Sequence, residues 1–423
     1  MNLSPSYICG NNDAYIRSPL SFLIFIWLPL AVGNIDFLSL HPVLLPIQQL
    51  IIIFVYFSAL LSFLSFFFLT RSVVFVFVFS SLLFLSLAFS YFSFGQVLQT
   101  ASFSLMVVWA YILSSRVEFL LLVTYLDKLF RMFFVVSVIY SLIFYSDSFA
   151  YVNDVFSIDS FFDHKNTYGR FLFFAVFFLC FARYLGYREG NYRSLMLDKQ
   201  FYFWLVIYFV FIFLTFSRTA LFMSVFSVVF ILFGSLIEKL SSFRYLFFVF
   251  FFLIFLSIGA SFSFGWLYFE NIGSALDCLM INQEYCLPLT GRATIWYNAL
   301  QDLIYDGNLY FGYGLGYYFS VLSPLRLSGI GLGPFLPSDS HNGYVDLLLN
   351  FGVFGGFFLF LFLANLLLNL HKIDGVQRVF VVFFVFVFLL FNVTESFFVK
   401  STNFTNFLLY YCFFLVLIGR YKS

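Results

Sequence analysis

The amino-acid sequence predicts an all-α polytopic membrane protein with about 12 transmembrane helices and one large, partly helical external loop. Of its 423 residues, 63% are hydrophobic and only 10% are charged, and the mean hydropathy is +1.00. A water-soluble domain of this length has no means of burying so much apolar surface. The apolar residues also form stretches near the length that crosses a hydrocarbon core of about 30 Å. The longest polar passage lies between Trp266 and Asn342.

The apolar stretches divide the chain into three parts. Residues 1–264 predict an N-terminal membrane bundle of about nine spans, residues 265–343 an external loop, and residues 344–423 about three further spans. We expect the first stretch to be a retained span, since it shows no small-residue cleavage pattern. The stretches run over residues 20–32, 43–69, 73–93, 97–114, 132–145, 169–185, 201–215, 219–236, 245–264, 344–370, 379–394 and 404–419.

Charged residues interrupt the apolar pattern ahead of the fifth stretch. Glu118, Asp127 and Arg131 lie there among apolar side chains. A helix that carries a charged face and an apolar face lies along the membrane surface more readily than it crosses the bilayer. We therefore interpret residues 119–131 as an amphipathic interfacial helix that precedes a separate span over residues 132–145.

Basic residues predict the orientation, because loops rich in Lys and Arg are retained in the cytoplasm. With both termini in the cytoplasm, most of the 21 Lys and Arg residues fall on that side. A basic residue on the translocated side runs against this preference and needs a reason. The residues that this topology leaves outside are Lys165, Arg170, Arg218, Arg292, Arg326 and Lys400.

Arg218 lies between two apolar runs that are too close together for a true loop to separate them. Its guanidinium is therefore expected at the external membrane interface or just below it, where an unpaired charge costs a few kcal/mol. One interpretation is an Arg that reaches lipid phosphate. The other is a fixed ligand for an anionic substrate group, because a planar guanidinium binds phosphate oxygens through two hydrogen bonds.

Two glycine-containing motifs lie in the external loop. Gly291 and Arg292 begin a stretch with helical periodicity, and a helix N-terminus attracts anions. A solvated Arg at the start of a surface helix is the alternative. The run from Gly312 to Gly316 resembles a dinucleotide-binding loop only superficially, because an external loop offers no βαβ unit. We expect those glycines to allow a tight turn and close packing against the membrane domain.

His341 stands at the external mouth of the bundle, directly before the span that begins near Val345. Asp346 follows at a spacing that is suitable for orienting an imidazole. A base and a simple hydrogen-bond donor at a helix end both fit this position. The four His residues of the chain show no metal-ligand spacing, so the sequence predicts neither a metal site nor a cofactor.

Composition bears on other partners and on covalent links. A net charge of +1 and the absence of a basic run argue against nucleic acid as a partner. The 73 Phe residues are expected to pack in the interior and to face membrane lipids. Cys278 and Cys286 share the external loop, where an oxidising compartment permits a structural disulfide, and we treat them as a candidate pair.

Taken in order, these motifs resemble those of the O-antigen ligase and polymerase superfamily. The resemblance covers roughly residues 160 to 370, and the ordered set is more specific than any one motif. The motifs are Lys165-Asn166 before a span, Ser217-Arg218-Thr219 between spans, Gly291-Arg292 with Trp296, the run from Gly312 to Gly316, and His341-Asn342-Gly343-Tyr344 ahead of Gly352 and Gly355-Gly356.

The resemblance implies a metal-independent, inverting glycosyltransferase that acts on undecaprenyl-diphosphate-linked glycans at the periplasmic face of the bacterial inner membrane. Arg218 and Arg292 would hold the lipid diphosphate, and His341 would act near the acceptor hydroxyl. A polysaccharide chain-length regulator is a further partner to expect. The residues that we predict to contact the substrate are Lys165, Asn166, Arg170, Arg326, Asn342 and Tyr344.

Superfamily members differ in the acceptor that they use. A polymerase transfers the growing glycan to the nonreducing end of another lipid-linked repeat unit, whereas a ligase transfers it to lipid A core. The element from Asp163 to Asn166 resembles polymerase members, so we favour a polymerase over a ligase. A transporter for lipid-linked glycans is the alternative from another class, and it would carry ionisable residues in the middle of its spans.

Overall fold

Among the residues that it describes, the computed structural model has eight α-helices, one short 3-10 helix and two two-stranded sheets. It describes most residues of 118–144, 149–188, 199–232, 292–314, 340–394 and 404–418, the strand residues 278–280 and 286–288, and a few isolated residues elsewhere. Its elements are α6 (Phe119–Ile143), β1 (Phe149–Val152), β2 (Val155–Ile158), α8 (Lys165–Arg188), α9 (Lys199–Thr215), α10 (Arg218–Leu232), β3 (Cys278–Met280), β4 (Cys286–Pro288), α13 (Arg292–Tyr305), α15 (Gly343–Leu368), η3 (Leu370–Lys372), α16 (Gly375–Thr394) and α17 (Phe404–Ile418).

Three of the described helices are long and apolar enough to cross a membrane. They are α8, α15 together with η3, and α16. Helices α9, α10 and α17 are shorter but also apolar. The predicted helical membrane class is confirmed in this part of the chain. The expected spans before residue 94 lie outside the described residues, as does most of the span at 245–264.

Aromatic side chains hold α8, α10 and α16 together. The ring of Phe383 in α16 stacks on Phe177 of α8 at 5.2 Å between centroids. It also stacks on Phe226 and Phe230 of α10, at 5.6 Å and 4.2 Å. Such ring pairs add to the stabilisation that burial alone provides. The described phenylalanines of the bundle interior therefore serve packing, as the composition predicted.

The prediction of a separate interfacial helix over residues 119–131 is wrong. Helix α6 continues without interruption for 25 residues, from Phe119 to Ile143. Two of its charges are paired within the helix, because Asp127 and Arg131 are one turn apart and form an ion pair of 2.6 Å, whereas Lys128 is exposed. The Arg131 guanidinium also lies 5.6 Å from the ring of Trp204 in α9. Neutralised in this way, the charges no longer require the helix to end.

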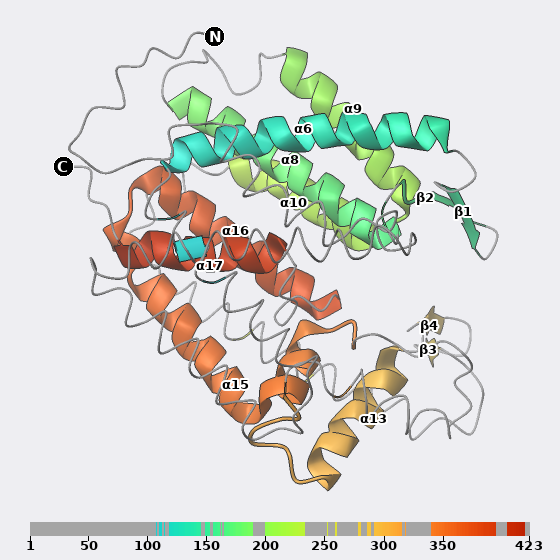
Figure 1. Ribbon diagram of the computed structural model, residues 1–423, viewed down its shortest axis with the longest axis vertical. Helices are drawn as coiled ribbons and strands as arrows, with labels where there is room; N and C mark the ends of the chain where they lie inside the picture. The colour runs from blue at the N-terminus through green and yellow to red at the C-terminus, as the bar shows by residue number, and fades with distance from the viewer. Residues whose placement is uncertain are drawn as a thin grey trace, which may run out of the picture.

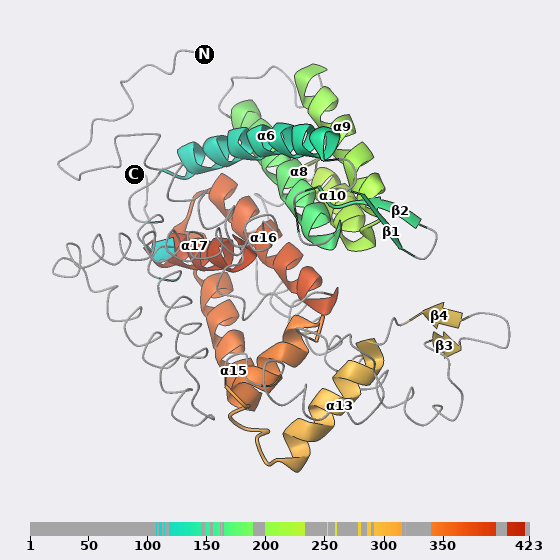
Figure 2. The same cartoon turned by 45° about the vertical axis from the view of Figure 1, so that its right-hand side comes forward.

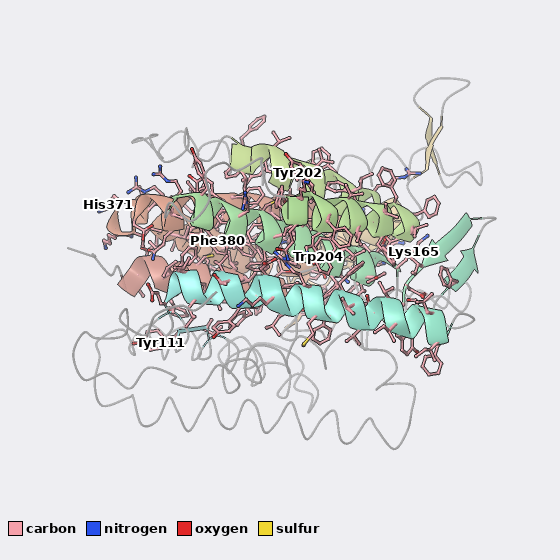
Figure 3. All side chains as sticks on the ribbon, turned by 90° about the horizontal axis from the view of Figure 1, so that it is seen from above. Tyr111, Lys165, Tyr202, Trp204, His371 and Phe380 are labelled. Atoms are coloured by element: carbon pink, nitrogen blue, oxygen red, sulfur yellow. The ribbon has the colours of Figure 1, made fainter. Side chains whose placement is uncertain are left out.

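The bundle has two distinct ends. Figure 3 shows Lys165, at the start of α8, and His371, in η3 directly after α15, at opposite ends of the bundle. We call the end with Lys165 the site end. There α8 and α10 approach closely, because a Cβ atom added to Gly169 would stand 2.7 Å from Cβ of Ser217. Any larger residue at position 169 would push the two helix N-termini apart.

Helix α13 and the first part of α15 lie side by side, below α6, α8 and α10 in the views of Figures 1 and 2. Helix α13 packs on α15 through one apolar face. The buried residues of this contact are Trp296, Ala299, Leu300, Leu303, Tyr313, Tyr318, Val345 and Leu349. The contact fixes part of the external loop directly against a membrane helix.

A break at Gly352 separates the two parts of α15. Gly352 has φ +61° and ψ −161°, a conformation that essentially only glycine adopts. The break frees the backbone carbonyl groups of Leu349 and Asn350. It also frees the N–H groups of Val353 and Phe354, and freed groups in a membrane helix must find partners within the protein.

The segment of residues 309–314 supplies all four partners. Tyr313 N–H donates to Leu349 O (2.7 Å), Gly314 N–H to Asn350 O (3.0 Å), Val353 N–H to Leu309 O (2.9 Å) and Phe354 N–H to Tyr310 O (3.2 Å). Gly312 permits this approach, since a Cβ atom there would stand 2.6 Å from the Asn350 backbone. The expectation that these glycines allow a tight turn and close packing is confirmed for Gly312 and Gly314, which have φ values of +73° and +88°.

Candidate functional site

Four helix N-termini carry the residues that the sequence singled out. Helix α8 begins with Lys165, α10 with Arg218 and α13 with Arg292, and His341 lies two residues before α15. None of the first turns of α8, α10 and α13 contains an acidic residue. A cation at the positive end of a helix dipole costs about 0.3–1 kcal/mol unless an anion is present. Three such positions therefore indicate an anion site.

A series of contacts brings these N-termini to the site end. Gly169 of α8 meets Ser217, which precedes Arg218. One turn further along α8, the ring of Phe173 lies 4.9 Å from that of Phe391, near the C-terminal end of α16. The neighbouring Asn392 side chain lies against Gly343, the first residue of α15.

The last contact in the series joins α15 to α13. Trp296 Nε1 donates a 2.7 Å hydrogen bond to the carbonyl of Ser340. Arg292, the first residue of α13, precedes Trp296 by four residues, which is about one helical turn. The backbone at Arg292 is thereby placed near the segment that holds His341. The side chain of Arg292 lies outside the described residues.

The start of α10 presents a positive charge outward. Arg218 is exposed, whereas the preceding Ser217 is buried. The Ser217 carbonyl accepts the N–H of Leu221 at 3.0 Å and so begins the helix. Phe216 forms the tight turn from α9 with a φ of +52°. The sequence prediction of an Arg at a turn between two apolar helices is therefore confirmed.

The start of α8 adds further polar and basic groups. Lys165, Asn166 and Arg170 are partly exposed. Arg170 Nη2 donates to Thr167 Oγ1 at 2.9 Å, which directs the guanidinium back along the helix toward its N-terminus. These residues share the site end with Arg218, because their first turns are joined through the contact at Gly169.

His341 lies in a strained turn: its own φ is +52°, and the residues on either side of it are buried. Left-handed φ values are uncommon for residues other than glycine, so the surrounding contacts must maintain this one. His341 itself is only partly buried, while Ser340 and Asn342 are fully buried. His341 is thus a partly exposed residue held between two immobilised neighbours.

Ser340 is the anchor of this turn, because every polar group it has is engaged. Its N–H donates to Asp346 Oδ1 at 3.1 Å, and its carbonyl accepts from Trp296 Nε1. Its Oγ donates to the Asn342 carbonyl (2.7 Å) and accepts the Asn342 N–H (3.1 Å). Asp346 therefore supports His341 through the backbone of Ser340, a route that the spacing of His341 and Asp346 did not predict.

Asn342 and Tyr344, both predicted to contact substrate, are buried and have structural partners. Asn342 Oδ1 accepts the N–H groups of Tyr344 and Val345, at 3.0 Å and 3.3 Å, and so caps α15. The Tyr344 hydroxyl donates to the Leu389 carbonyl of α16 at 2.9 Å. This geometry favours a positioning role for both residues over direct contact with a ligand.

Other predicted residues are placed only in part or not at all. Strands β3 and β4 pair Cys278 with Pro288 and Met280 with Cys286, so neither Cys lies directly opposite the other, and their disulfide stays a prediction. Arg326 lies outside the described residues.

Sequence reasoning missed two residues that build the site. Ser340 lies in the long polar passage and drew no separate prediction, although a serine hydroxyl commonly forms a hydrogen bond with nearby backbone and so favours a local turn. Asn392 was placed in an apolar span, where a single amide side chain signals a helix contact. Both act on the N-terminus of α15, through the turn before it and through Gly343.

Residues 201–361 match a protein-family model described as O-antigen ligase. This match supports placing residues 201–361 in the O-antigen ligase and polymerase superfamily. The match begins in α9 and ends in α15, beyond the break at Gly352, so it contains Arg218, Arg292 and His341 but not Lys165. No curated protein and no solved structure matches the chain.

The match to this superfamily confirms the resemblance that the sequence motifs indicated. Its members are glycosyltransferase-like enzymes of the bacterial inner membrane that act on lipid-linked oligosaccharides. The matched region contains both the break in α15 and residues 309–314, whose backbone forms hydrogen bonds with the groups that the break frees. The backbone pairing of residues 309–314 with α15 therefore lies in the region that matches the superfamily.

The role of Asp346 is testable with two substitutions of similar size. Asp346→Asn keeps an oxygen acceptor for the Ser340 N–H, so we expect glycan transfer within about threefold of wild type. Asp346→Leu leaves that buried N–H without its acceptor, which costs about 1–3 kcal/mol and loosens the His341 turn. Glycan transfer should then fall at least about tenfold. Equal damage from both variants, at equal protein levels in the membrane, would show instead that the negative charge matters.

Proposed function

We propose that the chain is an O-antigen polymerase that transfers an undecaprenyl-diphosphate-linked glycan onto the nonreducing end of another lipid-linked repeat unit. The observation that carries this proposal is the gathering of the N-termini of α8, α10, α13 and α15 at one end of a membrane bundle. Three of these termini begin with a basic residue, and His341 precedes the fourth. A lipid diphosphate is an anion that reaches such a site from the membrane.

The Arg residues fit the leaving group of this reaction. Transfer breaks the bond between the anomeric carbon and the diphosphate oxygen, so negative charge grows on the diphosphate. Guanidinium groups and helix N-termini that already point at this position stabilise the charge without rearranging. In the proposal Arg218 and Arg292 hold the diphosphate, and no metal ion is needed to neutralise it.

His341 fits the other half of the reaction. A neutral imidazole accepts the proton of the acceptor hydroxyl while that oxygen forms its bond to the anomeric carbon. Attack from the face opposite the diphosphate inverts the configuration at that carbon in a single displacement. The immobilised neighbours of His341 support this role, because a base must be held within hydrogen-bond reach of the proton it removes.

The remaining predicted residues are proposed to guide the two glycans. Lys165, Asn166 and Arg170 line the first turns of α8 and offer donors to sugar hydroxyl and acidic groups. Arg326 is proposed as a further contact from the loop. Asn342 and Tyr344 are proposed to act by holding α15 in place. A chain-length regulator is a proposed protein partner.

The site end is proposed to face the periplasm. The opposite end carries basic residues that include Arg188 at the end of α8 and Lys372 after α15. The positive-inside preference then places that opposite end in the cytoplasm, together with both chain termini. In this orientation the substrate glycans and the proposed active site share one compartment.

Deletion of the gene tests the proposed activity, with lipopolysaccharide analysed by gel electrophoresis. A polymerase defect leaves a single repeat unit attached to the core, and a plasmid copy of the gene restores the ladder. Bare core together with lipid-linked polymer would identify a ligase instead. Bare core with repeat units confined to the cytoplasmic leaflet would identify a transporter. Either of these last two outcomes overturns the polymerase proposal.

A further inference from the structure

An exposed aromatic surface lies where the turn after α13 meets the break in α15, outside the proposed active site. Three of its residues come from the end of α13 and the turn after it: Tyr305 (81% exposed), Tyr310 (61%) and Phe311 (51%). The fourth is Phe354 of α15 (46%), whose ring stacks on Phe311 at 5.0 Å. We call these four residues the aromatic surface. Contiguous exposed apolar groups of this kind mark an interaction site.

The aromatic surface continues into the exposed face of a membrane helix. Phe354, Phe357, Phe358 and Leu361 follow the spacing i, i+3, i+4 and i+7, and all four are exposed. They lie on the part of α15 that runs from Val353 to Leu368, which extends roughly 24 Å. Because this part of α15 belongs to a candidate membrane span, the exposed stripe is its lipid-facing side.

The position of the turn after α13 follows from the break in α15. Helix α13 lies beside the first part of α15 (Figures 1 and 2). The second part of α15 returns along the bundle, and the turn meets α15 where this change of direction occurs. Four backbone hydrogen bonds between residues 309–314 and the break hold the turn there.

The charges near the aromatic surface favour lipid over a charged partner. Residues 304–311 contain no basic residue, and their one acidic residue is Asp306. Asp306 is exposed, and its Oδ2 accepts a 2.7 Å hydrogen bond from the hydroxyl of the buried Tyr313. Apart from Asp306, the exposed side chains of residues 304–311 are aliphatic or aromatic, and tyrosine is enriched where apolar chains meet the polar head groups of a bilayer.

We propose that the aromatic surface inserts the turn of residues 305–311 into the bilayer, at the boundary between head groups and acyl chains on the site-end side. The external loop is then anchored in the membrane itself. This goes beyond the proposed glycan transfer, because it concerns where the loop sits and holds for any activity of the site. The occupant of the surface is phospholipid, in continuity with the lipid-facing stripe of α15.

Photocrosslinking of the full chain tests this placement. A benzophenone amino acid replaces Tyr310 or Phe311, and the purified protein is reconstituted in vesicles of phosphatidylethanolamine and phosphatidylglycerol. Tyr313 is the matched buried control, since it is the same residue type three positions away and only 1% exposed. Phe357, on the exposed stripe of α15, is the lipid-facing reference. Mass spectrometry after irradiation identifies the adducts.

The expected result is phospholipid adducts at positions 310 and 311, at yields comparable to position 357 and at least about fivefold above position 313. Absence of lipid adducts at 310 and 311, with adducts at 357, would overturn the proposal by placing the turn in water. Crosslinks to a second copy, or to another segment of the same chain, would overturn it by identifying a different occupant. Because the readout does not involve transfer activity, it is independent of the proposed function.

Discussion

Replacement of His341 by alanine should lower glycan transfer at least about 100-fold, because the acceptor hydroxyl loses the group that takes its proton. The backbone of the turn should survive, since its hydrogen bonds come from Ser340, Asn342 and Asp346. The measurement is the lipopolysaccharide ladder of a deletion strain that carries the variant, with the membrane level of the protein checked by immunoblot. A full ladder from His341→Ala would remove His341 from the mechanism.

Arg218→Ala and Arg292→Ala belong to the same prediction and should each reduce transfer by about 100-fold or more, since each removes a preorganised positive charge from the leaving diphosphate. Arg292→Lys should also lose most activity, because an ammonium group does not reproduce two parallel hydrogen bonds. Arg188→Ala is the matched control, as Arg188 is also exposed at a helix end but lies at the opposite end of α8. Equal activity of the Arg218 and Arg188 variants would place the diphosphate elsewhere.

Substitution of Gly352 by alanine should sharply reduce the amount of folded protein. The backbone at this position has φ +61° and ψ −161°, which costs a residue with a side chain about 1–3 kcal/mol. A Cβ atom would also collide with the backbone carbonyl of Tyr310. Relief of that collision separates residues 309–314 from α15 and breaks backbone hydrogen bonds, each contributing about 0.5–1.5 kcal/mol. The measurement is thermal unfolding in detergent.

Gly356→Ala provides the control for this experiment within the same helix. A Cβ atom added to Gly356 meets nothing within 4 Å, and the residue lies in regular helix. Alanine there should leave the melting temperature unchanged or raise it slightly, because alanine favours helix over glycine. Gly312→Ala should behave like Gly352→Ala, since it lies on the other side of the same contact. If the Gly352→Ala and Gly356→Ala variants have the same melting temperature, the contact between residues 309–314 and α15 does not stabilise the fold.

The sequence predicted the polar residues of the site better than the contacts that hold those residues in place. Arg218 at a tight turn and His341 ahead of a membrane span were readable, because few polar residues interrupt the apolar stretches around them. The pairing of the Gly312 segment with Gly352 was not readable in detail, since it joins residues about 40 positions apart through backbone groups that every residue carries. Periodicity describes one helix at a time and contains no information on such pairings.

Helix α6 illustrates a different limit of sequence reasoning. Its charges indicated a surface helix, because a charge in a span is costly when it stands alone. In the structure Asp127 and Arg131 neutralise each other, and Trp204 of another helix covers the guanidinium. The cost of a charge depends on its partners, and a partner on another helix is decided only by tertiary packing.

By itself the sequence determined the membrane class, the approximate positions of most described helices and the polar motifs that resemble those of the O-antigen ligase and polymerase superfamily. These properties follow from local hydropathy and from side-chain chemistry, which each residue carries wherever it lies. Only the tertiary structure decided that the N-termini of α8, α10, α13 and α15 meet at one end, and that Ser340 anchors the turn of His341. Those features arise from close approach of distant segments, which contacts at Gly169, Gly312, Gly343 and Gly352 make possible.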